Sequence, residues 1–183
     1  YDPASVDIVC ITHAHADHIG RLPKLVKDGF RGKIYATEPT AALMHVMLAD
    51  AYKIMRQECE RHGDEPLYDE KNLAQTFERV IPIPYDKEIS LPDNCSFFFR
   101  DSAHILGSAM VEVHAMDRII VFTGDLGNTP TPLLKTPHLI DSCDYLIMES
   151  VYGDRLHEKT SERKLKLERI IEDTVTQKGT III

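Results

Sequence analysis

The chain has 183 residues, which is enough for one domain with a hydrophobic core. Its composition, 43% apolar and 27% charged, is ordinary for a soluble globular protein. No apolar run reaches the roughly 20 residues of a membrane helix. The formal net charge of −8 argues against a simple nucleic-acid-binding module, which usually presents a basic surface.

The first part of the chain alternates predicted strands and helices. The β-branched run at 6–11 predicts a strand, a polar turn is expected at 13–20, and residues 22–27 predict a short helix. A second strand is expected at 33–36. Residues 40–57 predict a long helix with one buried apolar face, because apolar side chains recur there at helical spacing. These side chains are Met44, Met47, Leu48, Ala51 and Met55.

After a charged surface excursion at 58–70 and a helix expected at 73–79, the pattern changes from helical to extended. A last helix is predicted from Thr160 or Ser161 to Lys178, stopped by Gly179. The mixture predicts an α/β or α+β fold. Between these helices, strands are predicted at 80–84, 88–91, 96–100, 110–114, 118–122 and 145–149.

The two ends of the chain suggest a fragment of a longer protein. It begins at Tyr1 without a methionine or a signal-peptide pattern, and residues 180–183 resemble a strand that stops midway. The cysteines are scattered without a CxxC pair, which favours free thiols and a reducing, cytoplasmic compartment. Cys10 and Cys143 lie in or beside apolar runs, so we expect both to be buried.

The densest group of ligand-type side chains follows the first predicted strand, in Thr12-His13-Ala14-His15-Ala16-Asp17-His18. Residues i and i+2 of an extended segment point the same way, so His13 and His15 can reach one metal ion. Asp17 and His18 follow the turn and can face a second ion. Zinc favours imidazole nitrogen and carboxylate oxygen, and two ions can share a bridging carboxylate. The alternative is a surface cluster of polar turn residues.

His104 and Asp125 each follow a later predicted strand. His104 lies in Ala103-His104-Ile105-Leu106-Gly107-Ser108, and Asp125 lies in Phe122-Thr123-Gly124-Asp125-Leu126-Gly127. Taken alone, a histidine at a strand end is usually structural, and Gly-Asp-Leu-Gly is usually a turn. Together with the first motif they supply what a two-metal site needs, one more histidine for the first ion and one carboxylate that bridges both.

The ordered set H-x-H-x-D-H, then a lone histidine, then an aspartate after Phe-Thr-Gly, resembles the metallo-β-lactamase superfamily. The resemblance implies a partial αββα sandwich over 1–150, without the N-terminal strands that carry the first aspartate motif of that fold. It also implies two Zn²⁺ ions. Their implied ligands are His13, His15, Asp17, His18, His104 and Asp125.

Three segments narrow the resemblance to the β-CASP branch, which processes RNA or DNA. They are the segments around His104 and Asp125, and Glu149-Ser150-Val151-Tyr152-Gly153, which is the most diagnostic. The similarity is to the group of the cleavage-and-polyadenylation endonuclease and its bacterial and archaeal relatives. It implies that 151–183 begin the β-CASP insertion, and that two later histidines lie downstream, so the second metal site is incomplete in this chain.

The resemblance implies a zinc-dependent hydrolase that cuts phosphodiester bonds in single-stranded RNA. In that mechanism Asp17 orients the nucleophile, and Glu149 acts through a downstream histidine at the leaving group. DNA is an alternative substrate, and a homodimer is compatible with the resemblance. Another hydrolase of this fold, acting on a thioester, lactam or small phosphodiester, is disfavoured by the Glu149 segment. A non-catalytic scaffold subunit is disfavoured because every ligand expected in this segment is present.

No set of partner ligands surrounds any of the other histidines, so none is nominated for the site. His45 and His62 are expected on a helix and in a loop, both solvated, and His157 is expected to be structural or solvent-facing. The full set is His45, His62, His114, His138 and His157.

Overall fold

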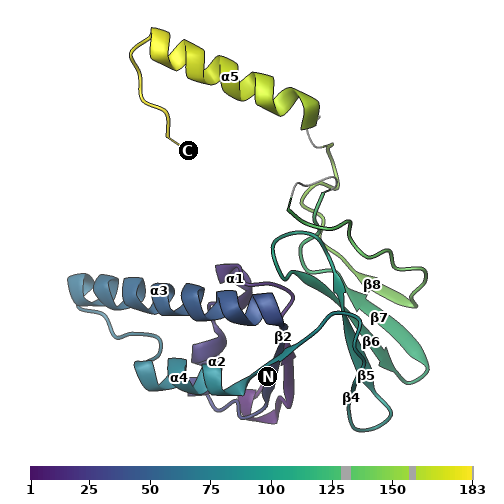
Figure 1. Ribbon diagram of the computed structural model, residues 1–183. Coiled ribbons are helices and arrows are strands. Elements are labelled where there is room, and N and C mark those ends of the chain that lie inside the picture. Colours follow the sequence, from purple (N-terminus) through teal and green to yellow (C-terminus); the bar gives the residue numbers. More distant parts are fainter. Residues whose placement is uncertain (129–132, 157–159, 183) are drawn as a thin grey trace. The chain divides into compact units, whose positions relative to one another are not determined.

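The computed structural model describes residues 1–128, 133–156 and 160–182, which form two compact units, 1–149 and 150–183 (Figure 1). The first unit combines helices with two sheets, so the predicted mixed α/β class is confirmed. Its helices are the 3₁₀ turn η1 (Pro3–Ser5), α1 (Ala16–Ile19), α2 (Leu22–Lys27), α3 (Glu38–His62) and α4 (Glu70–Arg79). Its strands are β1 (Ile8–Cys10), β2 (Lys33–Thr37), β3 (Val80–Ile83), β4 (Ile89–Ser90), β5 (Ser96–Asp101), β6 (Ala109–Ala115), β7 (Arg118–Phe122) and β8 (Tyr145–Ile147).

The smaller sheet is parallel, in the order β1-β2-β3, and its central strand β2 is buried on both faces. Ile34 and Ala36 face the helices and pack in one core with Met44 of α3 and Val26 of α2. Tyr35, which points the opposite way, packs in the second core. Burial on both faces explains why the strand is a short continuous apolar run rather than an alternating one.

The larger sheet has the order β4-β5-β6-β7-β8. β6 is antiparallel to both β5 and β7, and β8 is parallel to β7. Strands β5, β7 and β8 therefore run in the same direction, and the segments that follow them emerge at one edge of the sheet. This topology brings the segments that carry His104, Asp125 and Glu149 to the same edge.

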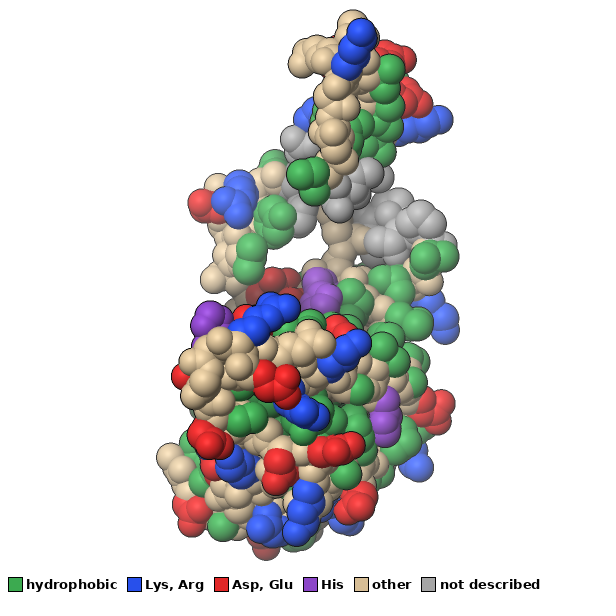
Figure 2. Space-filling view, turned by 90° about the vertical axis from the view of Figure 1, so that its left-hand side faces the viewer, with side chains coloured by type: hydrophobic (Ala, Val, Ile, Leu, Met, Phe, Trp, Pro, Cys, Tyr) green, Lys and Arg blue, Asp and Glu red, His purple; other side chains and the backbone are tan. Residues whose placement is uncertain are grey.

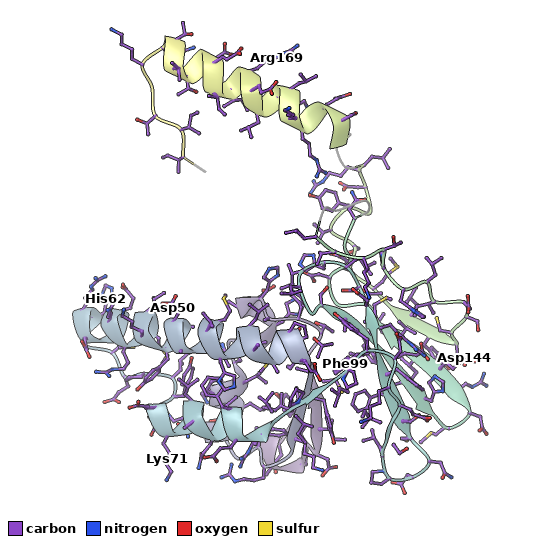
Figure 3. The ribbon with its side chains drawn as sticks, in the orientation of Figure 1. Asp50, His62, Lys71, Phe99, Asp144 and Arg169 are labelled. Atoms are coloured by element: carbon purple, nitrogen blue, oxygen red, sulfur yellow. The ribbon has the colours of Figure 1, made fainter. Side chains whose placement is uncertain are left out.

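The two sheets of the first unit pack against each other through aromatic and β-branched side chains. Phe97 and Phe99 of β5 are almost fully buried and lie in one cluster with Tyr35 of β2 and Val111 of β6. Figure 3 shows Phe99 between the two sheets. The described part of the unit is therefore a layer of helices followed by two layers of sheet.

Helix α3 begins earlier than its apolar spacing suggests. The hydroxyl of Thr37 caps it by accepting a hydrogen bond from the Thr40 N–H, and Pro39 lies in the first turn. Met44 and Leu48 are buried as predicted, but Met47 is 39% exposed, which corrects the expectation of one buried stripe. Met47 precedes Leu48 by one residue, so it is turned about 100° from it around the helix.

We expect Met44→Ala to destabilise the protein by about 2 kcal/mol, because it leaves a cavity between α3 and the smaller sheet. Met47→Ala is the matched control, and we expect it to change stability by less than about 0.5 kcal/mol because its side chain is exposed. Urea unfolding measures both values. Equal losses from the two variants would contradict this assignment of the buried face.

Two further segments of the first unit differ from the sequence predictions. The polar turn expected at 13–20 contains the short helix α1, which is anchored by the fully buried Ile19. Helix α3 continues into the expected surface excursion at 58–70, so His62 is helical rather than in a loop. The helix ends at Gly63, whose φ of 74° suits glycine and stops the helical hydrogen-bond pattern.

The cysteines are free thiols, in line with the absence of a CxxC pair. Cys10 and Cys143, expected to be buried, are both half-buried. Burial still raises the pKa of the Cys10 thiol to about 12. The Cys10 thiol is therefore protonated and unreactive at neutral pH.

The second unit contains α5 (Thr160–Thr176). The helix ends two residues before the predicted Lys178, which takes a left-handed φ of 54°. Residues 180–182 form no strand within the described part of the chain, which corrects the strand expected there; a lone strand has no partner for its hydrogen-bonding groups. His157 lies outside the described residues. The boundary at Glu149 and Ser150 lies beside the predicted one, and the identity of the second unit as an inserted domain stays a prediction.

Two surface properties bear on function. No helix in the described ranges is long and apolar enough to cross a membrane. On the face of the first unit shown in Figure 2, acidic and basic side chains are interspersed, so this face presents no large basic patch. This face therefore has no concentration of positive charge that would offset the net charge of −8.

Candidate metal centre

The first two histidines of the motif are held by an extended segment between β1 and α1. His15 is the N-cap residue of α1 and has extended backbone angles, φ −66° and ψ 150°. His13 lies two residues before it and is fully buried. The extended backbone points both rings to the same side, and His13 Nε2 lies 3.0 Å from His15 Nδ1. The predicted pairing of these two side chains is therefore present in the folded chain.

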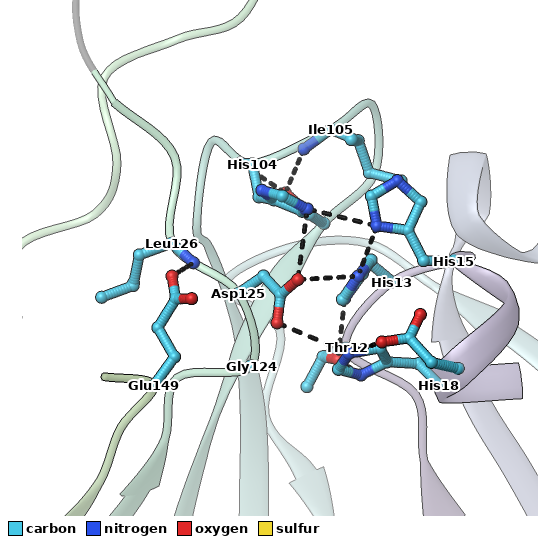
Figure 4. Close-up of polar contacts among 12 residues, drawn as sticks. Thr12, His13, His15, His18, His104, Ile105, Gly124, Asp125, Leu126 and Glu149 are labelled. Atoms are coloured by element: carbon cyan, nitrogen blue, oxygen red, sulfur yellow. Dashed lines mark hydrogen bonds and ion pairs between the residues drawn. The ribbon is translucent and has the colours of Figure 1, made fainter. Parts of the chain in front are cut away.

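His104 and Asp125 complete a group of four with these histidines (Figure 4). His104 Nε2 lies 3.2 Å from His15 Nδ1 and 3.4 Å from Asp125 Oδ2. Asp125 Oδ2 also lies 3.5 Å from His13 Nε2. Four zinc ligands at 2.0–2.1 Å in a tetrahedron are separated by about 3.3–3.4 Å. Four of the separations within this group are 3.0–3.5 Å, and all four ligand atoms lie within 4.8 Å of one another, so the group is close enough to hold a metal ion.

A second group uses the other oxygen of the same carboxylate. Asp125 Oδ1 lies 3.4 Å from His18 Nε2, which lies 3.5 Å from Asp17 Oδ2. The two oxygens of Asp125 thus face two different sets of ligand atoms, as expected for a carboxylate that bridges two metal ions. Asp17 is the most exposed member, with 79% of its side chain accessible, so its carboxylate remains open to solvent.

The protonation of His13 suits a metal ligand. Burial, and then the nearby positive charge of His18 when that ring is protonated, lower the pKa of His13 to about 4. The ring is therefore neutral at pH 7, and its Nε2 can donate a lone pair to a metal ion.

Ser108 shapes the segment that presents His104. The Ser108 hydroxyl accepts hydrogen bonds from the backbone N–H groups of His104 (2.9 Å) and Ile105 (3.1 Å). Ala103, which directly precedes His104, has a left-handed φ of 55°, and its N–H donates a hydrogen bond to the Asp101 carboxylate at 2.8 Å. The tight turn that these bonds create directs the His104 ring toward the other three members of the group.

A buried hydrogen-bond network connects this turn to the other sheet. The carbonyl of Gly107 accepts the hydroxyls of Thr37 (2.5 Å) and Thr40 (2.8 Å), at the start of α3. The Tyr85 hydroxyl donates to the carbonyl of Ser108 at 2.9 Å. Burial, together with the negative charge of Asp101, raises the pKa of Tyr85, so its hydroxyl stays protonated and remains a donor. The turn that carries His104 is thus fixed by residues far away in the sequence.

Sequence reasoning did not assign roles to Ser108, Gly107 or Thr37. One local signal was available, because Thr37-Glu38-Pro39 is a helix-capping pattern that places Thr37 at the start of α3. Gly107 lies 70 residues after Thr37 and 67 residues after Thr40 in the sequence. No local pattern predicts contacts of that separation.

Glu149 lies beside the centre rather than within the group of four. One of its carboxylate oxygens, Oε1, accepts the backbone N–H of Leu126 at 2.6 Å, and its own N–H donates to the Thr123 hydroxyl at 3.2 Å. Leu126 follows Asp125 directly, so Glu149 connects the end of β8 to the segment that holds the bridging carboxylate (Figure 4).

The remaining described histidines lie apart from the metal centre. His45, His62 and His138 are exposed. His114 has an acidic partner that the sequence did not indicate, since its Nε2 lies 2.8 Å from Glu112 Oε1. That carboxylate also binds the Arg100 guanidinium, so the contact belongs to an ion-pair group on the larger sheet.

We expect Ser108→Ala to destabilise the protein by about 1–3 kcal/mol, because two backbone N–H groups lose their buried acceptor. Ser102→Ala is a matched control: both serines are fully buried, but the Ser102 hydroxyl has no hydrogen-bond partner within the described ranges. Removing that hydroxyl is expected to be neutral or stabilising. Urea unfolding distinguishes the two, and a smaller loss for Ser108→Ala than for Ser102→Ala would contradict the prediction.

The chain is similar to known proteins along its whole length. It is 37% identical to Ribonuclease TTHA0252 of Thermus thermophilus over 183 residues, covering 100% of this chain. It is 30% identical to Endoribonuclease YSH1 of Eremothecium gossypii, again over 100% of the chain. It is 31% identical to Transcription termination factor FttA of Methanococcus maripaludis over 97% of the chain. The chain spans 40%, 24% and 28% of the lengths of these three proteins.

These relatives agree with the β-CASP nuclease branch that the sequence motifs resemble, and that resemblance is confirmed. Residues 3–150 match the metallo-beta-lactamase superfamily domain, a range that contains all six residues predicted as metal ligands. The family implies divalent metal ions, and the group of four described above could hold one. By this match over most of its length, the chain belongs to the metallo-β-lactamase superfamily.

Proposed function

We propose that the protein to which this chain belongs is a zinc-dependent ribonuclease that hydrolyses phosphodiester bonds in single-stranded RNA during RNA processing. The observation that carries the proposal is the placement of the Asp125 carboxylate, whose two oxygens face separate ligand groups. The names of the relatives, which include a ribonuclease and an endoribonuclease, support RNA as the substrate.

In this proposal six side chains would hold two zinc ions, with the second set completed from elsewhere in the longer protein. They are His13, His15, His104 and Asp125 for the first ion, and Asp17, His18 and the other oxygen of Asp125 for the second. Zinc bound there would supply a water that ionises near neutral pH, and the zinc ions would stabilise negative charge on phosphoryl oxygens.

The residues of this chain would then orient the reaction. The exposed carboxylate of Asp17 accepts a hydrogen bond from the attacking water. This hydrogen bond holds the water in line with the bond between phosphorus and the leaving oxygen. A bond forms between the water oxygen and phosphorus, and the bond to the leaving nucleoside oxygen breaks. Glu149, acting through a histidine elsewhere in the longer protein, helps a proton reach that leaving oxygen.

The net charge of −8 is the feature that fits RNA least. Two zinc ions would offset part of it at the centre, and the proposal assigns the basic surface that holds the RNA to the remainder of the longer protein. It also places the protein in the cytoplasm, which the free thiols support. Cell fractionation tests the location, and recovery with secreted or periplasmic proteins would contradict it.

The proposal is tested by cleavage of an end-labelled single-stranded RNA by the full-length protein, with zinc and after zinc removal by a chelator. We expect cleavage that zinc restores, with product lengths that separate endonuclease from exonuclease action. A DNA strand of the same sequence distinguishes the two nucleic acids. A protein that binds zinc but cuts neither strand would contradict the nuclease proposal and favour another substrate on the same fold.

Glu149 can act at the leaving group through its charge, or it can hold the segment after Asp125 through its hydrogen bond to the Leu126 N–H. Two variants separate these roles. Glu149→Gln keeps an oxygen that can accept the Leu126 N–H but removes the charge, and we expect it to lower RNA cleavage about 10²-fold without changing zinc content. Glu149→Ala removes the acceptor as well, and we expect it to lower both. Cleavage rates and zinc content are measured on the same preparations. Wild-type cleavage by Glu149→Gln would show that Glu149 is only a positioning residue.

A further inference from the structure

Thr12, the residue that directly precedes the histidine motif, contacts several parts of the metal centre at once. Its backbone carbonyl accepts the N–H of Ala109 at 2.7 Å, which fixes the end of the β1 segment to the start of β6. Its half-buried side chain is directed toward the histidines, as Figure 4 shows. The backbone of Thr12 is therefore held independently of the contacts made by its hydroxyl.

The Thr12 hydroxyl lies near one histidine from each ligand group. Thr12 Oγ1 is 3.1 Å from His13 Nδ1 and 3.4 Å from His18 Nδ1. In both rings the other nitrogen, Nε2, faces the Asp125 carboxylate, at 3.5 Å from Oδ2 for His13 and 3.4 Å from Oδ1 for His18. One oxygen atom thus contacts the outer nitrogen of both rings.

The chemistry of imidazole fixes the direction of these two contacts when the centre holds metal. A ring that gives its Nε2 lone pair to a metal ion keeps its proton on Nδ1, so both Nδ1–H groups are donors. A hydroxyl oxygen has two lone pairs, and it can accept both hydrogen bonds at once. The Thr12 oxygen is placed to do this for a ligand of each ion.

The carbon atoms of Thr12 make a further contact, with the residue that precedes Asp125. A Cβ built on Gly124 would lie 2.7 Å from the Thr12 Cβ and 2.9 Å from its Cγ2, so only glycine fits there, and Gly124 also has a left-handed φ of 54°. Thr12 therefore packs against the residue that directly precedes Asp125, as well as contacting two histidine rings.

We propose that Thr12 is a positioning residue whose hydroxyl is shared between the two ligand groups, so that a single side chain orients one histidine of each metal ion. The inference rests on the two-metal centre of the proposed function, but not on RNA as its substrate. Partners of this kind typically change metal affinity by about 10–100-fold when removed.

Two substitutions separate the hydroxyl from the shape of the side chain. Thr12→Val keeps the branched shape against Gly124 and removes the acceptor, whereas Thr12→Ser keeps the acceptor and removes the methyl group. Zinc affinity is measured on the full-length protein by competition with a chromophoric chelator, and zinc content by mass spectrometry. Thermal unfolding of the metal-free forms reports any loss of structure.

We expect Thr12→Val to weaken the binding of both zinc ions by about 10–100-fold, with metal-free unfolding close to wild type. Thr12→Ser is expected to bind zinc like the wild type. Wild-type affinity in Thr12→Val, weakening of one ion only, or equal losses in both variants would overturn the inference. Failure of the wild type to bind two zinc ions would refute the centre itself. Zinc binding without RNA cleavage would refute only the nuclease proposal.

Discussion

Replacing Asp125 with alanine is expected to lower RNA cleavage by the full-length protein at least about 10³-fold, and to reduce its zinc content below the wild-type value. The reason is that Asp125 belongs to both ligand groups. Its Oδ2 lies within 3.5 Å of His13 and His104, and its Oδ1 lies 3.4 Å from His18. One substitution therefore removes a ligand from each proposed ion.

The measurements are cleavage of end-labelled RNA and zinc content on the same preparation, so that a loss of chemistry can be assigned to a loss of metal. Asp50→Ala is the matched control, because Asp50 is an exposed carboxylate on the outer side of α3 (Figure 3). The control should keep wild-type cleavage and zinc content. Full activity in Asp125→Ala would refute the bridging role.

Gly107→Ala is expected to destabilise the protein by about 3–4 kcal/mol. Gly107 has a left-handed φ of 85°, which is strained for alanine. A Cβ there would also lie 2.5 Å from the backbone nitrogen of Thr40 and 2.9 Å from the Pro39 side chain. The nearest of these atoms belongs to the backbone at the start of α3, which cannot move aside as a flexible side chain could. The turn that carries His104 must therefore move, and we expect both stability and zinc affinity to fall.

Gly63→Ala separates strain from overlap in that experiment. Gly63 also has a left-handed φ, 74°, but an added Cβ would meet nothing within 4 Å. We expect Gly63→Ala to cost about 1 kcal/mol, the strain alone, with zinc affinity unchanged. Urea unfolding of both metal-free variants gives the difference. If the two variants were equally destabilised, the close packing of Gly107 against α3 would not be the cause.

The sequence by itself determined the class of fold and supplied the candidate metal ligands of the centre. Strands followed from β-branched runs and helices from apolar spacing, because these periods reflect which face of each element is buried. The spacing of His13, His15, Asp17 and His18 made them candidate metal ligands, since an extended segment and a turn place such side chains together, and the later His104 and Asp125 segments strengthened that prediction. Those patterns are local, so a linear sequence can carry them.

Only the tertiary structure decided how the centre is assembled. His104 and Asp125 are unremarkable in isolation, and they meet the first motif because β5 and β7 run in the same direction and end at one edge of the sheet. The assignment of one Asp125 oxygen to each ligand group likewise depends on how the separate loops meet. The burial of Met44 but not Met47, and the contacts of Gly107 with Thr37 and Thr40, depend on neighbours distant in the sequence. Packing between layers sets these features, and the order of residues along one element does not encode it.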